Sequence, residues 1–257
     1  MYPALPFGPV TIPTGPLVAL VAVTIGLEVA GRFGRRLHLA IDDVWNTGLL
    51  ATLATVIVAR LWNVIQFWGA YSAEPWLILS LRPSGFVWNA GLTAGIIVAY
   101  LYLLRRALPP LPITAALASG VLTAIAIFTA GAYLTGNLVG LPSTLPWALP
   151  YFGVLRHPVA FYYAVGFALL VGSGGLLMQR VSVGRLLLLW LLGSGLLLLW
   201  LAAYEEGSRT FLSLRVNQLL GLGLALVACL GLARTGVNAP TSRNEAEELT
   251  PNQTSLQ

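Results

Sequence analysis

The sequence predicts an all-α, polytopic integral membrane protein with about seven transmembrane helices. Three observations support this fold class. Hydrophobic residues make up 57% of the 257 residues, charged residues make up only 9%, and the mean hydropathy is +0.81. A soluble chain carries about a quarter charged residues. The apolar residues also gather in runs of about 20, the length that an α-helix needs to cross a hydrocarbon core about 30 Å thick.

Seven apolar runs are the candidate transmembrane helices. They cover residues 12–31, 44–67, 86–104, 113–133, 159–178, 186–204 and 216–233. Prolines gather at 109–112 and again at 142–150, and they mark the turns before the fourth and fifth runs. The runs form one predicted domain, residues 1–237. Residues 238–257 are polar and are expected to form a disordered cytoplasmic tail.

The ends and interiors of several runs carry signals of their own. Asp42 and Asp43 precede the second run and are interpreted as the N-terminal cap of a helix. Gly91 and Gly95 form a GxxxG pattern in the third run, which indicates close packing against another helix. Pro158 stands just before the fifth run and suits the first turn of a helix.

The arginines predict how the chain is oriented. The chain has no lysine, so all 14 of its basic side chains are arginines, and the formal net charge is +5. One side of the predicted membrane holds nine of them, Arg32, Arg35, Arg36, Arg105, Arg106, Arg180, Arg185, Arg234 and Arg243, and the other holds Arg82, Arg156, Arg209 and Arg215. The positive-inside rule therefore places the N-terminus outside and the C-terminus in the cytoplasm. Because no basic stretch with interleaved aromatic residues lies outside the apolar runs, no nucleic-acid partner is expected.

Uncommon polar side chains gather at the predicted outer ends of the runs. They are Asn63, Gln66, Asn89, Thr129, Asn137, Arg156, His157, Glu205, Glu206, Arg209, Asn217 and Gln218. Arg60 follows Val44 by about 16 residues, which at 1.5 Å per residue places it in the outer third of the bilayer. Asn63 and Gln66 follow it on the same strip of the helix. The pattern predicts an anion-receptive pocket that opens outward and sideways into lipid.

Arg60 is the most informative single residue, because a charge inside a membrane span is costly unless it pairs or snorkels. One interpretation is a ligand for an anionic phosphate, since a guanidinium donates two hydrogen bonds to adjacent oxygens. The other is an arginine that snorkels to the outer headgroups or is held by Glu205 or Glu206.

A second polar cluster precedes the fifth run. Arg156 and His157 stand just before the expected helix N-terminus, where the helix dipole attracts an anion. His157 is the only histidine predicted on the outer side, and its alternative interpretation is a solvated interfacial side chain. Tyr162 is either a membrane-interface anchor or a donor to a ligand.

A third cluster, Glu205, Glu206 and Arg209, ends the sixth run and is either a surface ion pair or part of a site. The chain has no Ser-His-Asp spacing, no Walker loop and no cluster of metal ligands. No cofactor or metal is therefore expected, and the residues alone do not name a reaction.

Five segments, taken in order, look like those of one family. "DDVWNTGLLATLATVIVARLWNVIQFW" looks like its second span, with Arg60 at the family's arginine, and "GFVWNAGLTAG" looks like its Gly-x-x-x-His-Gly-Gly-Leu segment. "FTAGAYLTGNLVG" sits at its signature loop, and "LRHPVAFYYA" looks like Arg-His-Pro-Ser-Gln-Leu-Tyr-Glu. "YEEGSR" with "VNQLLGLGLAL" looks like its Glu-x-x-Arg and the Gly-Gln opening of its last span. From about Pro13 to Arg234 the chain resembles prolipoprotein diacylglyceryl transferase, the bacterial membrane enzyme that starts lipoprotein maturation.

Several polar residues of that family are replaced in this chain. The family has a histidine in its third span, and Asn89 stands there in this chain. In the signature loop, the family's arginine falls at Thr129, its two asparagines fall at Ala132 and Thr135, and its glutamate falls at Asn137. The family's arginine before Glu206 falls at Ala202, and its glutamate after Tyr162 falls at Tyr163. Asparagine cannot take a proton near neutral pH, so Asn89 cannot replace the acid–base chemistry of a histidine.

The resemblance implies a transferase that moves diacylglyceryl from phosphatidylglycerol to a lipobox cysteine thiol of a preprolipoprotein, in the bacterial cytoplasmic (inner) membrane. Phosphatidylglycerol, the preprolipoprotein and membrane lipids are the expected partners. The implied catalytic residues are His157, Arg156 and Asn89, and the implied substrate- and phosphate-binding residues are Arg60, Asn63, Tyr162, Asn137, Glu206 and Arg209. Two alternatives stay open: a non-catalytic lipid-binding relative that kept the fold, and a small-anion transporter.

Overall fold

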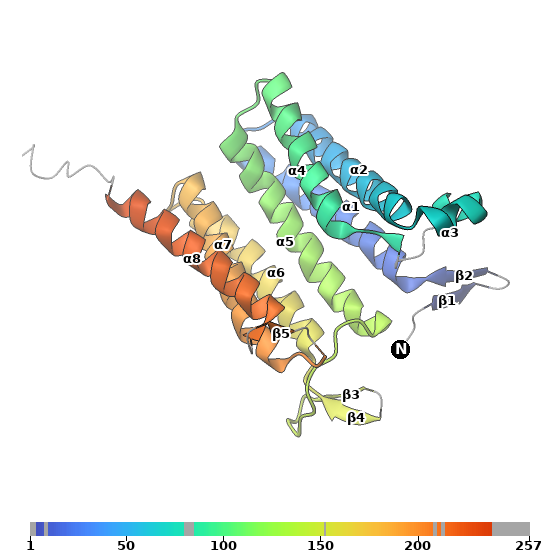
Figure 1. Ribbon diagram of the computed structural model, residues 1–257. Coiled ribbons are helices and arrows are strands. Elements are labelled where there is room, and N and C mark those ends of the chain that lie inside the picture. The colour runs from blue at the N-terminus through green and yellow to red at the C-terminus, as the bar shows by residue number, and fades with distance from the viewer. Residues whose placement is uncertain are drawn as a thin grey trace, which may run out of the picture.

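The computed structural model describes residues 4–7, 10–79, 85–151, 153–207, 210–211 and 214–237 (Figure 1). The predicted tail at 238–257 lies outside these residues, as does Arg209. The long helices are α1 (Thr14–Arg36), α2 (Ile41–Gln66), α4 (Trp88–Arg105), α5 (Pro110–Thr135), α6 (Val159–Leu177), α7 (Val183–Leu201) and α8 (Val216–Val237). Short helices are α3 (Trp68–Ala73), η1 (Pro75–Leu79) and η3 (Ala202–Tyr204).

Three antiparallel hairpins complete the described chain. They pair β1 (Ala4–Phe7) with β2 (Val10–Pro13), β3 (Leu149–Tyr151) with β4 (Val154–Arg156), and β5 (Thr210–Phe211) with β6 (Leu214–Arg215). All three lie at the same end of the helix bundle, which we call the hairpin end (Figure 1). The opposite end, where α1, α4, α6 and α8 finish, is called the arginine end because Arg36, Arg105, Arg106, Arg180, Arg185 and Arg234 lie there.

The protein is a polytopic, all-helical membrane protein. Within the described residues, six helices are long and apolar enough to cross a membrane: Thr14–Arg36, Ile41–Gln66, Pro110–Thr135, Val159–Leu177, Val183–Tyr204 and Val216–Thr235. The remaining long helix, α4, has 18 residues, carries Asn89 in its first turn and Arg105 at its end, and is not among these six. The predicted count of seven spans therefore stays a prediction.

The helix ends follow from the local sequence. Proline at the start of α5 fits a first turn, where no intrahelical N–H is needed. Gly136 ends the same helix with φ 78°, a left-handed conformation that glycine adopts at little cost. The α1 helix runs five residues beyond the predicted end at 31, since Arg32 bonds Glu28 one turn earlier (2.8 Å) and Arg35 and Arg36 suit a last turn.

Small residues let the helices approach closely. The helix α1 packs along α5, α2 along α4, and α7 along α8. A Cβ placed on Gly91 or Gly95 would come closer than 3.0 Å to Thr55 of α2, so the packing predicted from the GxxxG pattern is confirmed. Gly26 of α1 and Gly120 of α5 face each other in the same way.

Apolar side chains face both inward and outward, as expected when the surrounding solvent is lipid. The core includes Phe33 and Trp190, whose ring centroids are 5.3 Å apart. Facing outward, Ile96 is 70% exposed and Leu169 is 69% exposed. Exposed tryptophans at the hairpin end, among them Trp76, are typical of a membrane–water interface.

Candidate active site

The candidate site lies at the hairpin end, where a returning strand brings three parts of the chain together. After Gly136 the chain crosses from α5 toward the end of α7, and Leu141 N–H donates to the carbonyl of Tyr204 (2.8 Å). Gly140 pairs with Glu205 in an antiparallel bridge, and Glu206 N–H donates to the carbonyl of Val139 (2.8 Å). The segment 139–142 therefore holds the residues that follow η3 beside those that precede α6.

On the other side, the same segment contacts the Arg-His-Pro turn. His157 N–H donates to the carbonyl of Leu141 (3.0 Å), and Pro142 pairs with Arg156. A Cβ on Gly140 would come closer than 3.0 Å to the carbonyl of His157. Only glycine fits at position 140 without displacing this turn.

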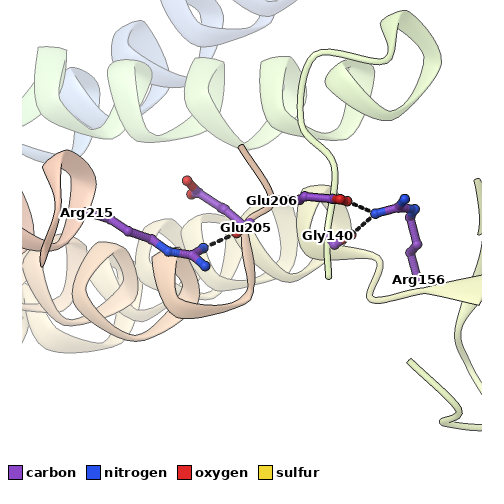
Figure 2. Close-up of polar contacts among 5 residues, drawn as sticks. All are labelled: Gly140, Arg156, Glu205, Glu206 and Arg215. Carbon is purple, nitrogen blue, oxygen red and sulfur yellow. Dashed lines mark hydrogen bonds and ion pairs between the residues drawn. The ribbon is translucent and has the colours of Figure 1, made fainter. Parts of the chain in front are cut away.

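Arg156 is held in place by two acceptors. Its Nη1 donates to the carbonyl of Gly140 (3.1 Å) and forms an ion pair with Glu206 (Figure 2). The side chain of Arg156 is only 14% exposed, whereas that of Glu206 is 43% exposed. The Nε–H of Arg156 is buried and has no hydrogen-bond partner among the described residues. The guanidinium therefore keeps donor capacity for a ligand oxygen or a water.

His157 is half-buried and borders two hollows. A small cavity of about 10 Å³, room for about one water, is lined by Arg156, His157 and neighbouring residues of α5, β3 and α6. An open hollow of about 680 Å³ is lined by His157 and by residues of the 142–144 and 153–155 segments. The imidazole centroid lies 5.1 Å from that of Tyr204 and 6.3 Å from that of Tyr162.

Two tyrosines at this end differ in what they contact. The hydroxyl of Tyr162 accepts a hydrogen bond from the indole N–H of Trp147 (2.7 Å), which holds it at the surface of the hairpin end. Tyr151, in β3, is buried, and this burial together with the nearby Tyr133 raises the pKa of its hydroxyl above the usual value of about 10. Tyr151 therefore stays protonated at physiological pH.

Glu205 forms a buried network next to this site. The residue is 4% exposed, and its carboxylate accepts from the hydroxyl of Tyr163 (2.7 Å) and from Nδ2 of Asn217 (3.0 Å). Arg215 donates to the carbonyls of Ala202 (2.5 Å) and of Glu205 itself. Figure 2 shows the Glu205 carboxylate directed away from Arg156, while that of Glu206 is directed toward it. The sequence left open whether Glu205 and Glu206 form a surface ion pair or part of a site, because adjacency along the chain does not reveal which glutamate turns inward, and it assigned no site role to Tyr163.

Arg60 belongs to a separate cluster on α2. Its Nε donates to the carbonyl of Ile78 (3.0 Å), its Nη1 to that of Gly85 (2.8 Å), and its Nη2 to that of Leu77. The guanidinium also lies 5.3 Å from the ring centroid of Tyr71 and 5.5 Å from that of Phe86.

Backbone carbonyls, and not Glu205 or Glu206, are thus the partners of Arg60, which corrects the ion-pair alternative. Asn63, 7% exposed, accepts from the Tyr71 hydroxyl (2.8 Å) and supports the same segment. No hydrogen bond or ion pair among the described residues joins this cluster to Arg156.

The remaining predicted site residues make no side-chain hydrogen bond to either cluster among the described residues. Asn89 is exposed in the first turn of α4, and Asn137 is exposed just after α5. The hydroxyl of Thr129 donates to carbonyls of its own helix, Ile125 (2.8 Å) and Ala126 (3.1 Å). The part of the chain that the structure describes holds no group of three His, Cys, Asp or Glu residues that could bind a metal ion.

Comparison with known proteins gives one consistent family. Residues 3–234 match the family described as prolipoprotein diacylglyceryl transferase. A phosphatidylglycerol–prolipoprotein diacylglyceryl transferase of Clostridioides difficile (strain 630) is 28% identical over 141 residues, 55% of this chain and 57% of that protein. One of Trichormus variabilis is 24% identical over 246 residues, 88% of this chain and 86% of that protein. One of Parasynechococcus marenigrum is 30% identical over 143 residues, 56% of this chain and 51% of that protein.

Proposed function

This chain belongs to the prolipoprotein diacylglyceryl transferase family, and on that premise we propose that it transfers diacylglyceryl from phosphatidylglycerol to the lipobox cysteine of a preprolipoprotein. In this reaction a sulfur–carbon bond forms and the bond between that carbon and the phosphate-ester oxygen breaks. Glycerol phosphate leaves, and the thiol loses its proton. The chemistry therefore needs a cation at the departing phosphate and a group that accepts a proton.

The observation that supports this proposal best is Arg156 at the hairpin end. Its guanidinium is held by Gly140 and Glu206, and its Nε–H is unpaired among the described residues. The exposed Glu206 carboxylate can move aside when a phosphate takes its place on Nη1, and the buried Nε–H can donate to a water in the small cavity that Arg156 lines. Arg156 then stabilises the negative charge that grows on the leaving group.

His157 is the proposed proton acceptor. Its ring borders the open hollow of about 680 Å³, which has room for a peptide segment or a lipid headgroup, and its neighbour along the chain is Arg156. The thiolate is the reactive form of cysteine, so a base beside the entering thiol speeds the attack. Tyr162 borders the same ring and is proposed to contact substrate.

The residues of the second cluster are proposed to organise the entrance. Arg60 donates three of its five N–H groups to the carbonyls of Leu77, Ile78 and Gly85, and the other two, which have no acceptor among the described residues, are proposed to bind a phosphate. Asn63, Asn137 and Arg209 stay proposed substrate contacts, and Asn89 stays a proposed catalytic residue. We further propose that α4 is the seventh span, with the hairpin end outside the bacterial inner membrane.

The test is a transfer assay with purified protein in phosphatidylglycerol vesicles. Diacylglyceryl label should move from phosphatidylglycerol to a synthetic lipobox peptide, and not to the same peptide with serine in place of cysteine. Arg156→Gln should lower the rate by about 100-fold or more, the size of effect seen when one charge-stabilising donor is removed. Arg105→Gln, at the arginine end, is the matched control and should leave the rate unchanged. An active Arg156→Gln variant would exclude this role for Arg156.

A second candidate, a non-catalytic lipid-binding protein, is favoured by one observation. Thr129 stands where the family's arginine is expected, and its hydroxyl is occupied by carbonyls of its own helix. This protein would bind phosphatidylglycerol without transferring it. Retention of the lipid in an Arg156-dependent manner, with no label on the peptide, would select this function over the transferase.

A further inference from the structure

A second large hollow lies at the arginine end, far from the candidate active site. Its volume is about 760 Å³, and it is lined by Arg36 from the end of α1 and by Gly172, Gly175, Leu176, Met178 and Gln179 from the end of α6. The α1 and α6 helices both finish at this end of the bundle (Figure 1). The hollow therefore reaches from the helix ends into the last two turns of a membrane-spanning helix.

The glycines that floor this hollow have no helix packed against them. A Cβ on Gly172 would meet nothing within 4 Å, and one on Gly175 would meet only the tip of Arg36, at 3.0 Å. Gly174, between them, is instead packed against another helix, since a Cβ there would come closer than 3.0 Å to Trp190 of α7. Glycine weakens a helix relative to alanine, so two glycines without a packing partner keep space open rather than bring helices together.

The cation in this hollow is also without a protein partner. Three arginines at this end have acceptors: Arg32 pairs with Glu28 (2.8 Å), Arg106 with Asp43 (3.8 Å), and Arg185 donates to the carbonyl of Thr235 (2.8 Å). Arg36 is distinguished from the other arginines at this end by its position in the lining of the hollow. Within the described chain, the side chain of Arg36 makes no hydrogen bond or ion pair, and its guanidinium lies over Gly175. The hollow thus combines a guanidinium that has no acceptor among the described residues with a floor formed by two glycines.

We propose that this hollow binds one anionic phospholipid, with its phosphate on Arg36 and an acyl chain along Gly172 and Gly175. A guanidinium fits two phosphate oxygens at once, and basic pockets between membrane helices at the cytoplasmic side bind lipid headgroups in this way. The six residues from Gly172 to the end of α6 at Leu177 are separated by five rises of 1.5 Å, about 8 Å of helix, enough to hold the first carbons of a chain below the headgroup. The exposed Leu176, at 75%, extends the apolar surface beside it.

The site is tested by lipid retention. Protein is released from bilayers of phosphatidylcholine and phosphatidylglycerol with matched acyl chains, and native mass spectrometry counts the lipids that remain bound. Arg36→Gln and Gly172→Leu should each lower retained phosphatidylglycerol by at least threefold, the first by removing the cation and the second by filling the floor. Because a Cβ at position 172 meets no atom within 4 Å, the leucine variant is expected to fold.

Three controls distinguish this lipid site from the candidate active site and from a simple anion site. Gly223→Leu, on an open face of α8 where a Cβ also meets nothing within 4 Å, should retain the lipid. The Arg156→Gln variant should still retain the lipid that depends on Arg36. This result would distinguish that lipid from a substrate bound at the hairpin end, whether or not the proposed transferase activity holds. Inorganic phosphate added to the detergent solution should not displace it, since the acyl chain supplies part of the binding.

Several results would overturn the proposal. Equal retention of phosphatidylcholine and phosphatidylglycerol would mean that any lipid fills the hollow. Unchanged retention in both Arg36→Gln and Gly172→Leu would place the lipid elsewhere. If the wild-type protein is a dimer and Gly172→Leu is a monomer, this face binds a second copy of the chain instead of a lipid. If inorganic phosphate displaces the bound phosphatidylglycerol, the hollow is a simple anion site.

Discussion

Replacing Glu205 by alanine tests the buried network beside the candidate active site. The residue is 4% exposed, and its carboxylate accepts hydrogen bonds from Tyr163 (2.7 Å) and Asn217 (3.0 Å). Alanine removes both acceptors and leaves a hydroxyl and an amide N–H without partners. Glu205 also lies opposite Gly140 in the bridge that joins the returning strand to the end of α7, so loosening it is expected to disturb this strand.

The expected loss of stability follows from the two donors, the Tyr163 hydroxyl and the Asn217 amide, that lose their acceptor. A buried donor that loses its partner costs about 1–3 kcal/mol, so the Glu205→Ala variant should lose about 2–6 kcal/mol of stability. At about 2–4 °C per kcal/mol for chains of 150–250 residues, the melting temperature falls by at least about 4 °C. Glu206→Gln is the matched control and should change the melting temperature less, because that side chain is 43% exposed and glutamine keeps an oxygen acceptor for Arg156, which also bonds Gly140.

The assay is thermal unfolding of purified protein in detergent, arranged as a double-mutant cycle. Tyr163→Phe alone removes one hydrogen bond to a carboxylate, worth about 1.5–3 kcal/mol. In the Glu205→Ala background the same change removes a hydroxyl that has no acceptor, so it should cost little or restore stability. Additive losses in the double variant would refute the reasoning, since they would mean that the hydroxyl of Tyr163 finds its partner elsewhere.

Two further predictions concern the α2–α4 side of the bundle. Gly91→Leu should lower the melting temperature by several degrees, because its Cβ would come closer than 3.0 Å to the carbonyl of Thr55, whereas Gly69→Leu, where a Cβ meets nothing within 4 Å, should not. Arg60→Gln should increase proteolysis between residues 74 and 88, since three backbone carbonyls lose their donor. Arg60→Lys should restore little protease resistance, because an ammonium cannot reproduce the planar set of N–H donors of a guanidinium. Equal protease resistance of wild type and both variants would contradict this anchoring role.

The polytopic helical architecture and most helix positions were predictable from the sequence. Hydropathy over about 20 residues is a local property, and it located the six apolar helices that the structure confirms. The close approach at Gly91 was predictable for a related reason, because small residues four apart lie on one helix face. The Arg-His-Pro turn was also recognised as a helix start, since Pro158 is the residue that immediately precedes α6.

The partners of the buried polar groups were decided only by the tertiary structure. Arg60 bonds carbonyls 17 to 25 residues away, and Glu205 meets Tyr163 across 42 residues, on paths set by loops that hydropathy does not describe. Two adjacent glutamates look equivalent along the chain, yet one is buried and the other faces Arg156. The insertion of an apolar helix into lipid depends on the local composition of the chain, which the sequence gives directly. A hydrogen bond needs two groups at the right distance and angle, and only the folded chain brings such groups together.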